Sequence, residues 1–121
     1  MKRITATVTA IVLLFGLAAC SANRNTFDGQ ACGDLLRRAE EIGTNSDTGE
    51  AYARIERTLS YYDDEIEDTL LAAQWKIASD AGMFIQFGEV SLKDPEFTSW
   101  VAKSEATQEK CKDMGYKPAT Y

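Results

Sequence analysis

The sequence predicts an all-α fold, a small bundle of three to four helices with one long central helix, after a cleaved signal peptide. Three observations favour this class. Apolar residues recur every three or four positions in three segments, the spacing of one helical face. The prolines, Pro95 and Pro118, stand where a helix can begin or has ended. No segment shows the strong apolar–polar alternation that is typical of a half-buried strand.

The first predicted helix covers residues 28–42. Cys32, Leu35, Ala39 and Ile42 follow one another at spacings of three and four, so they share one face. Gly43 comes directly after this stripe and fits a C-terminal cap, where glycine adopts the left-handed conformation most easily.

A long helical pattern follows a turn. Asp47 and Glu50 are spaced as in a capping box, which indicates a helix start. A single helix over residues 48–87 would be about 60 Å long. Its apolar stripe comprises Ala51, Ile55, Leu59, Tyr62, Ile66, Leu70, Ala73, Ile77, Ala81 and Phe84.

Acidic residues interrupt the middle of this segment. Asp63 and Glu67 stand four residues apart, as do Asp64 and Asp68, and like charges at that spacing destabilise a continuous helix. The same acids would be favourable in the first turn of a new helix, so the chain has an alternative break near Tyr62. We favour the unbroken or gently kinked helix because the stripe keeps its phase across the acids.

The last predicted helix begins at Asp94-Pro95-Glu96, with an acidic cap, proline in the first position and a negative first turn. It ends at Gly115. Its core face comprises Phe97, Val101, Ser104, Gln108 and Cys111.

The N-terminal residues have the pattern of a secretory signal. Lys2 and Arg3 precede an uncharged, mostly apolar run over residues 4–18, and small residues follow. The run is shorter than the roughly 20 apolar residues of a spanning helix. Export to an oxidising compartment is therefore expected.

The end of this signal, Leu17-Ala18-Ala19-Cys20, resembles the lipobox of bacterial lipoproteins. The resemblance implies that the Cys20 thiol carries a diacylglycerol and that cleavage removes residues 1–19. Residues 20–27 would then form a tether and residues 28–121 the helical domain. Two acyl chains anchor a protein stably. In Gram-negative lipoproteins, Asp directly after the lipidated Cys favours retention in the inner membrane. Ser21 at this position therefore indicates the outer membrane if the source is Gram-negative. In any other source the anchor would lie at the extracytoplasmic face of the cell membrane.

The mature chain is acidic and has one pair of cysteines left. Loss of Lys2 and Arg3 lowers the basic residues from 13 to 11 against 19 acids, a formal charge of -8. Such a chain is a poor ligand for nucleic acid. Cys32 and Cys111 are expected to form a disulfide after export. The bridge requires that the long segment breaks near Tyr62, or that a loop over residues 88–94 returns along an unbroken helix.

The sequence contains few of the residues and motifs that enzymes use for catalysis. The chain has no His, which removes the commonest general base and imidazole metal ligand. It contains no CxxC pair, phosphate loop or dinucleotide fingerprint. We expect no enzyme activity, no cofactor and no metal site.

Two groups remain as candidate binding residues. The acidic cluster, with Asp63, Asp64 and Glu67, suits a basic partner or is only a solvated face. Phe84 and Phe87 lie in the most apolar stretch of the mature chain, and any part left exposed would suit a partner. The sequence thus predicts a lipid-anchored, non-enzymatic protein-binding module of the exclusion, immunity or inhibitor type. The alternatives are an assembly lipoprotein of an envelope complex and a small-ligand carrier.

Overall fold

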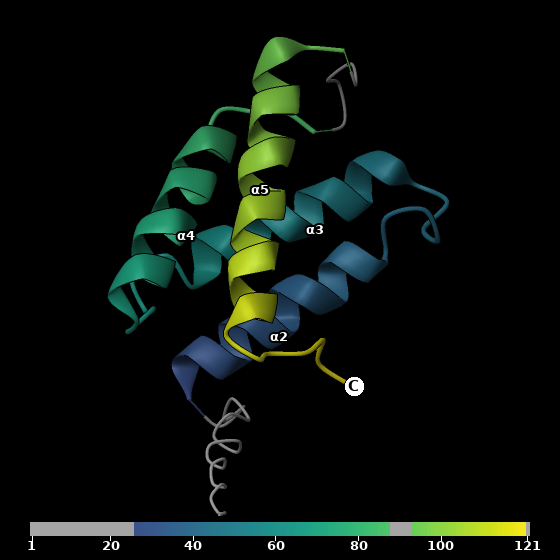
Figure 1. The fold of residues 1–121 in the computed structure, drawn as a ribbon. Coiled ribbons are helices and arrows are strands. Elements are labelled where there is room, and N and C mark those ends of the chain that lie inside the picture. Colours follow the sequence, from purple (N-terminus) through teal and green to yellow (C-terminus); the bar gives the residue numbers. More distant parts are fainter. Residues whose placement is uncertain (1–25, 88–92, 121) are drawn as a thin grey trace, which may run out of the picture.

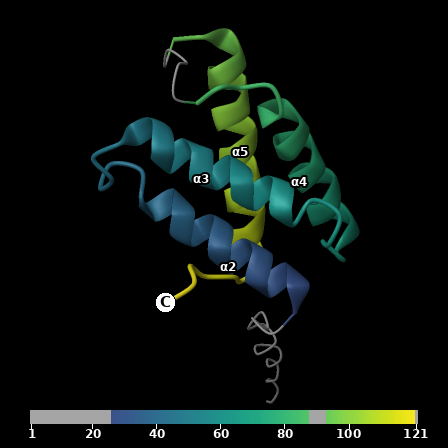
Figure 2. The same ribbon diagram turned by 180° about the vertical axis from the view of Figure 1, so that it is seen from behind.

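The computed structural model describes residues 26–87 and 93–120. These residues form four helices and no strand, so the predicted class, a small all-α bundle, is confirmed. Figures 1 and 2 show α2 and α3 side by side and antiparallel, with α4 and α5 as a second antiparallel pair that crosses them. No described helix is long and apolar enough to cross a membrane. The helices are α2 (Phe27–Glu40), α3 (Thr48–Tyr61), α4 (Thr69–Gly82) and α5 (Pro95–Asp113).

Side-chain caps fix where three of the helices begin. The Thr26 hydroxyl accepts the Gly29 N–H over 3.0 Å at the start of α2. Asp47 accepts the Glu50 N–H over 2.9 Å at the start of α3, which is one half of the predicted capping box; the Asp47 N–H is donated to Asn45 instead of Glu50. Each cap satisfies a backbone donor that has no partner within the helix.

The favoured continuous central helix is wrong, and the alternative break near Tyr62 is correct. Helix α3 ends at Tyr61, and α4 begins at Thr69. The buried Asp28 carboxylate of α2 accepts the N–H groups of Glu67 at 2.7 Å and of Asp68 at 2.9 Å. Because those amides are bound from outside, they cannot extend α3, and Asp68 instead caps α4 by accepting the Leu71 N–H over 2.9 Å.

The predicted stripe also loses its phase at this break. Leu70, Ile77 and Phe84 were expected in the core, but they are 68%, 48% and 89% exposed. The segment between α3 and α4 rotates the second helix relative to the first. Helix α4 therefore buries a different face, formed by Leu71, Trp75, Ala78, Ser79 and Gly82.

The break folds the chain so that its first and last helices meet. Cys32 of α2 and Cys111 of α5, both fully buried, form a disulfide with a Cα–Cα distance of 5.6 Å, in line with the prediction. Trp75 and Trp100 are the largest fully buried side chains and fill the centre of the bundle. Cys20 lies outside the described residues, as do the signal peptide and most of the tether.

Candidate functional site

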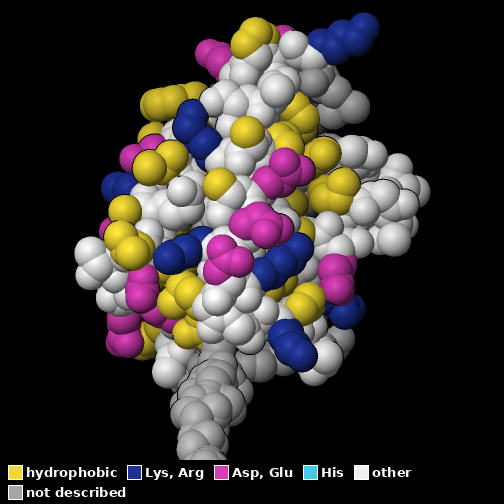
Figure 3. All heavy atoms as spheres, viewed as in Figure 1, with side chains coloured by type: hydrophobic (Ala, Val, Ile, Leu, Met, Phe, Trp, Pro, Cys, Tyr) yellow, Lys and Arg dark blue, Asp and Glu magenta, His cyan; other side chains and the backbone are white. Residues whose placement is uncertain are grey.

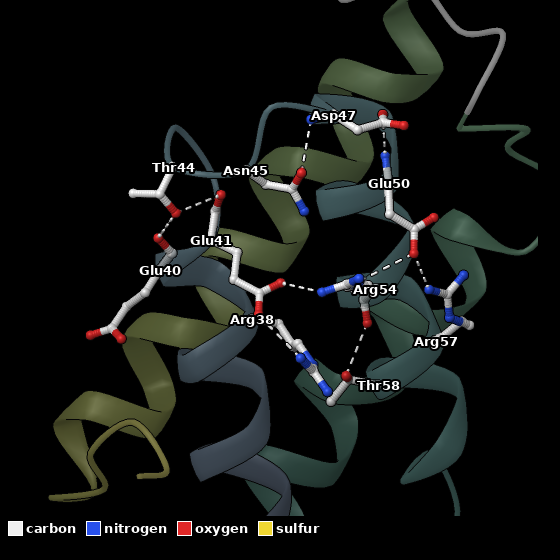
Figure 4. A network of polar contacts seen from close by, with 10 residues as sticks. All are labelled: Arg38, Glu40, Glu41, Thr44, Asn45, Asp47, Glu50, Arg54, Arg57 and Thr58. Carbon is white, nitrogen blue, oxygen red and sulfur yellow. Dashed lines mark hydrogen bonds and ion pairs between the residues drawn. The ribbon is translucent and has the colours of Figure 1, made fainter. Parts of the chain in front are cut away.

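The strongest candidate site is a surface pocket of about 300 Å³ between α2 and α3. We call it the arginine pocket, because three of its lining side chains are arginines. Figure 4 shows how these arginines and the neighbouring glutamates extend toward one another from the two helices and the turn that joins them. The lining residues are Asp34, Arg38, Arg54, Arg57, Thr58, Tyr61 and Tyr62.

Alternating charges link the three arginines into one network. Glu41 accepts N–H groups from Arg38 over 3.1 Å and from Arg54 over 3.3 Å. Glu50 accepts from Arg54 over 3.2 Å and from Arg57 over 2.7 Å. The two carboxylates therefore link the three guanidinium groups across α2 and α3, although each exposed ion pair adds little stability by itself.

The network favours the charged forms of Glu50 and Arg54. Hydrogen bonds from Arg57 and then Arg54 lower the pKa of Glu50 below its usual value. Hydrogen bonds to Glu50 and then Glu41 raise the pKa of Arg54 further. Both shifts favour the charged forms of Glu50 and Arg54, so this ion pair persists at physiological pH.

Two tyrosines complete the pocket. The Tyr62 hydroxyl donates to the Asp34 carboxylate over 2.6 Å. This bond orients the Tyr62 side chain, which lines the pocket with an aromatic ring and a polar hydroxyl. The Tyr61 ring meets it edge to face at 4.9 Å and is 77% exposed. Tyr61 and Tyr62 also line a second pocket of about 280 Å³ with Phe27, Gln30 and Glu65.

The composition of the arginine pocket suits binding. Guanidinium groups recognise carboxylates and phosphates through paired N–H donors, and Tyr and Arg are enriched at the energetic centres of protein interfaces. Arg57 has 63% of its side chain exposed, so it lies at the pocket mouth. The pocket can therefore receive an acidic group, with an aromatic ring beside it.

The structure separates the acidic residues that the sequence grouped. Asp63 forms an ion pair with Lys76 at 3.2 Å, whereas Asp64 and Glu67 are exposed. Asp68 is used as the cap of α4. Within residues 26–87 and 93–120, no three Asp, Glu or Cys side chains converge as a metal site needs.

The structure also places the two candidate phenylalanines in different environments. Phe84 is almost fully exposed in the turn after α4. Phe87 is half-buried, and its ring packs against Trp100 at 4.7 Å and Phe97 at 6.2 Å. Phe84 is therefore available to a partner, whereas Phe87 belongs mainly to the core.

Sequence reasoning missed the arginine pocket. It gave no binding role to Arg38, Arg54, Arg57 or Tyr61. A signal was present, because Arg54 and Arg57 are one turn apart and a short turn makes α2 and α3 antiparallel neighbours. That signal identifies a charged face only once the two helices are known to pair.

No protein-family model, curated protein or solved structure matches this chain.

Proposed function

We propose that the chain is a lipid-anchored protein of the bacterial cell envelope that binds a protein partner without catalysis. The arginine pocket would be its binding surface, and an acidic segment of the partner its ligand. Within this class, exclusion, immunity and inhibitor proteins fit the size and the anchoring best.

The observation that carries the proposal is the composition of the pocket mouth. Arg57 and Tyr61 are both largely exposed, while Glu50 holds Arg57 in place over 2.7 Å. A guanidinium that is already oriented loses less conformational freedom when it binds a carboxylate. In a chain with a formal charge of -6, three arginines gather at this one pocket, which favours a local acidic contact over general attraction.

The anchoring is supported by the lipobox residues at positions 17–20 and by the position of the domain. Helix α2 starts at Phe27, so a tether of about seven residues would separate it from Cys20. Fully extended, that tether spans about 20–25 Å. The domain would therefore act close to the membrane surface, on a partner in or near that membrane.

The alternatives draw less support. Carriage of a small apolar ligand needs an interior cavity, whereas Trp75 and Trp100 fill the centre of the described bundle. An assembly protein of an envelope complex would use the same anchor and pocket. It would differ from an exclusion, immunity or inhibitor protein in having a permanent partner present in stoichiometric amounts.

The test is affinity capture of the full chain from its own envelope, with mass spectrometry of the captured proteins and of Cys20. Four chains are compared: wild type, Cys20→Ala, Arg57→Glu and the charge-matched control Lys112→Glu, at an exposed position of α5. We expect an acylated wild type that retains one protein, which Arg57→Glu loses and Lys112→Glu keeps. A partner retained equally by Arg57→Glu would reject the pocket, and an unmodified Cys20 would reject the anchor.

A further inference from the structure

We propose that two copies of this chain associate through the exposed face of α4, with the two helices antiparallel and a twofold axis at Ile77. This inference uses a different surface from the arginine pocket and does not depend on the proposed function.

Helix α4 is apolar on two sides, and the bundle covers only one of them. Leu71, Trp75 and Ala78 face the core and are fully buried. We call the other side the α4 stripe; Figure 3 shows hydrophobic side chains exposed along the edge of the molecule that α4 forms. Leu70, Ala73, Ile77 and Phe84 of the stripe are exposed, and Ala81 is half-buried. A contiguous apolar surface of this kind marks an interaction site.

The order of residues in the stripe is the same in both directions. Spacings of three, four, four and three residues run from Leu70 to Phe84, with Ile77 at the centre, and Phe84 itself lies in the turn that directly follows α4. Size follows the same symmetry, since Ala73 and Ala81 are small while the central and terminal residues are large. A twofold interface requires a surface that is complementary to itself.

Antiparallel pairing about Ile77 matches each position with one of similar size. Ile77 would meet the partner's Ile77, and Ala73 would meet the partner's Ala81. Leu70 would meet the partner's Phe84 at each end. The two alanine positions would let the helix backbones approach closely, because they add little bulk between the axes.

Charges beside the stripe also become complementary in this arrangement. Lys76 and Asp80 lie on the same edge, one residue before and three residues after Ile77. A twofold axis at Ile77 brings Lys76 to within two residues of the partner's Asp80 along the helix, about 3 Å. Both side chains are more than half exposed, and Lys76 lies 3.6 Å from Asp80 and 3.2 Å from Asp63 within its own chain. Two reciprocal pairs across the dimer would extend this charge cluster.

The area is sufficient for a reversible dimer. With roughly 200 Å² for a large side chain, the exposed parts of Leu70, Ile77 and Phe84 offer about 400 Å² per chain. Two chains would therefore bury about 800 Å² of apolar side chain, to which the flanking charged side chains would add, and this lies in the range of weak, reversible interfaces. A lipid surface fits less well, because Asp63 and Asp80 border the stripe and anionic headgroups would repel them.

Sedimentation of the full chain in density-matched non-ionic detergent tests the dimer. Every variant carries Cys20→Ser, so that neither lipid nor an intermolecular disulfide can join two chains. We expect a monomer–dimer equilibrium that Ile77→Glu shifts to monomer, because the change places two carboxylates against each other at the axis. Ala102→Glu, on an exposed position of α5, should leave the dimer intact. Circular dichroism would check that both variants stay helical.

A charge exchange tests the register. Lys76→Glu and Asp80→Lys should each weaken self-association, whereas an equal mixture of the two should form a mixed dimer in which both reciprocal pairs are attractive. A wild type that stays monomeric at all concentrations would overturn the proposal. So would a dimer that Ile77→Glu leaves unchanged, a mixture without preference, or a monomer that binds phosphatidylcholine vesicles through the stripe.

Discussion

The Trp100 indole N–H donates to the Glu56 carboxylate over 3.1 Å and so joins α5 to α3 inside the bundle. Ser60, one turn along α3, donates to the second carboxylate oxygen over 2.9 Å. Burial raises the pKa of Glu56 to about 7, and the negative charges of Asp63 and Asp80 add to the rise, while both hydrogen bonds oppose it. Near neutral pH the domain therefore contains a half-buried carboxyl group that is partly protonated.

Glu56 should make the domain less stable as the pH rises toward neutrality. Its folded pKa of about 7 lies above the value of 4.5 for an unperturbed carboxyl, so the folded chain holds this proton more tightly. The resulting stability is complete below about pH 4.5 and is lost as the pH passes about 7. With allowance for solvent screening of a half-buried side chain, the loss is on the order of 1 kcal/mol. Thermal unfolding at about pH 5.5 and about pH 8 would show it as a fall of roughly 4–8 °C in Tm.

Glu56→Gln is the matched control for this pH dependence. The amide oxygen can still accept the Trp100 N–H, but the side chain no longer titrates. The variant should lose the difference in Tm between the two pH values and should equal or exceed the wild type at the higher pH. An equal pH dependence in both proteins would assign the effect to other groups.

Gly82 should be required for the contact between Trp100 and Glu56. A Cβ at position 82 would overlap the Glu56 carboxylate and would lie 2.6 Å from the Trp100 ring nitrogen. Gly82→Ala should therefore destabilise the domain by about 1–3 kcal/mol, although alanine normally favours a helix over glycine. Chemical denaturation would measure the loss. In a Glu56→Ala background the cost should be smaller, and strict additivity would contradict the proposed overlap.

The sequence was sufficient for the all-α class and for the starts of α3 and α5, but not for the break between α3 and α4 or for the face that α4 buries. The starts of α3 at Asp47 and of α5 at Asp94-Pro95 were readable because the signals are local, although the Asp94 side chain makes no capping hydrogen bond to α5, contrary to the prediction. Helix α4 could not be oriented in the same way, since Leu70 and Ile77 form a stripe as regular as that of Leu71 and Trp75. The residue that decides between them is Asp28, which contacts Glu67 and Asp68 from about forty positions earlier in the chain.

The need to know how helices pack also explains which of the candidate sites could be predicted from the sequence. The Cys32–Cys111 pairing was predictable because only two cysteines remain once Cys20 is assigned to the lipobox. The arginine pocket was not predictable, because Arg38 and Arg57 come from different helices and neither has a motif. Charge spacing describes one helix, whereas a pocket depends on how two helices pair.

Asp28→Asn should weaken the junction between α2 and α4. Asp28 is 6% exposed and accepts two backbone N–H groups, whereas an asparagine has one acceptor oxygen and would place its NH2 group against the second donor. One unsatisfied buried amide costs about 1–3 kcal/mol. Chemical denaturation should show this loss, and hydrogen exchange should accelerate first at the amides of Glu67 and Asp68. The exposed control Asp64→Asn should change neither, and equal effects of both variants would contradict the role of Asp28.

Removal of the disulfide should cost a large part of the stability of the domain. The bridge closes a loop between positions separated by 79 residues, which the chain-entropy model values at roughly 4–5 kcal/mol. A small domain has only about 5–15 kcal/mol in total. Otherwise the first and last parts of the fold meet through limited helix packing and the Ala119 N–H donated to the Gly33 carbonyl over 2.9 Å. A Cys32→Ser, Cys111→Ser double variant should therefore unfold at much lower denaturant, with α2 and the segment after α5 exchanging their amide hydrogens first. Cys20→Ser should leave both measurements unchanged, and a double variant within about 1 kcal/mol of the wild type would mean that core packing alone holds α2 against α5.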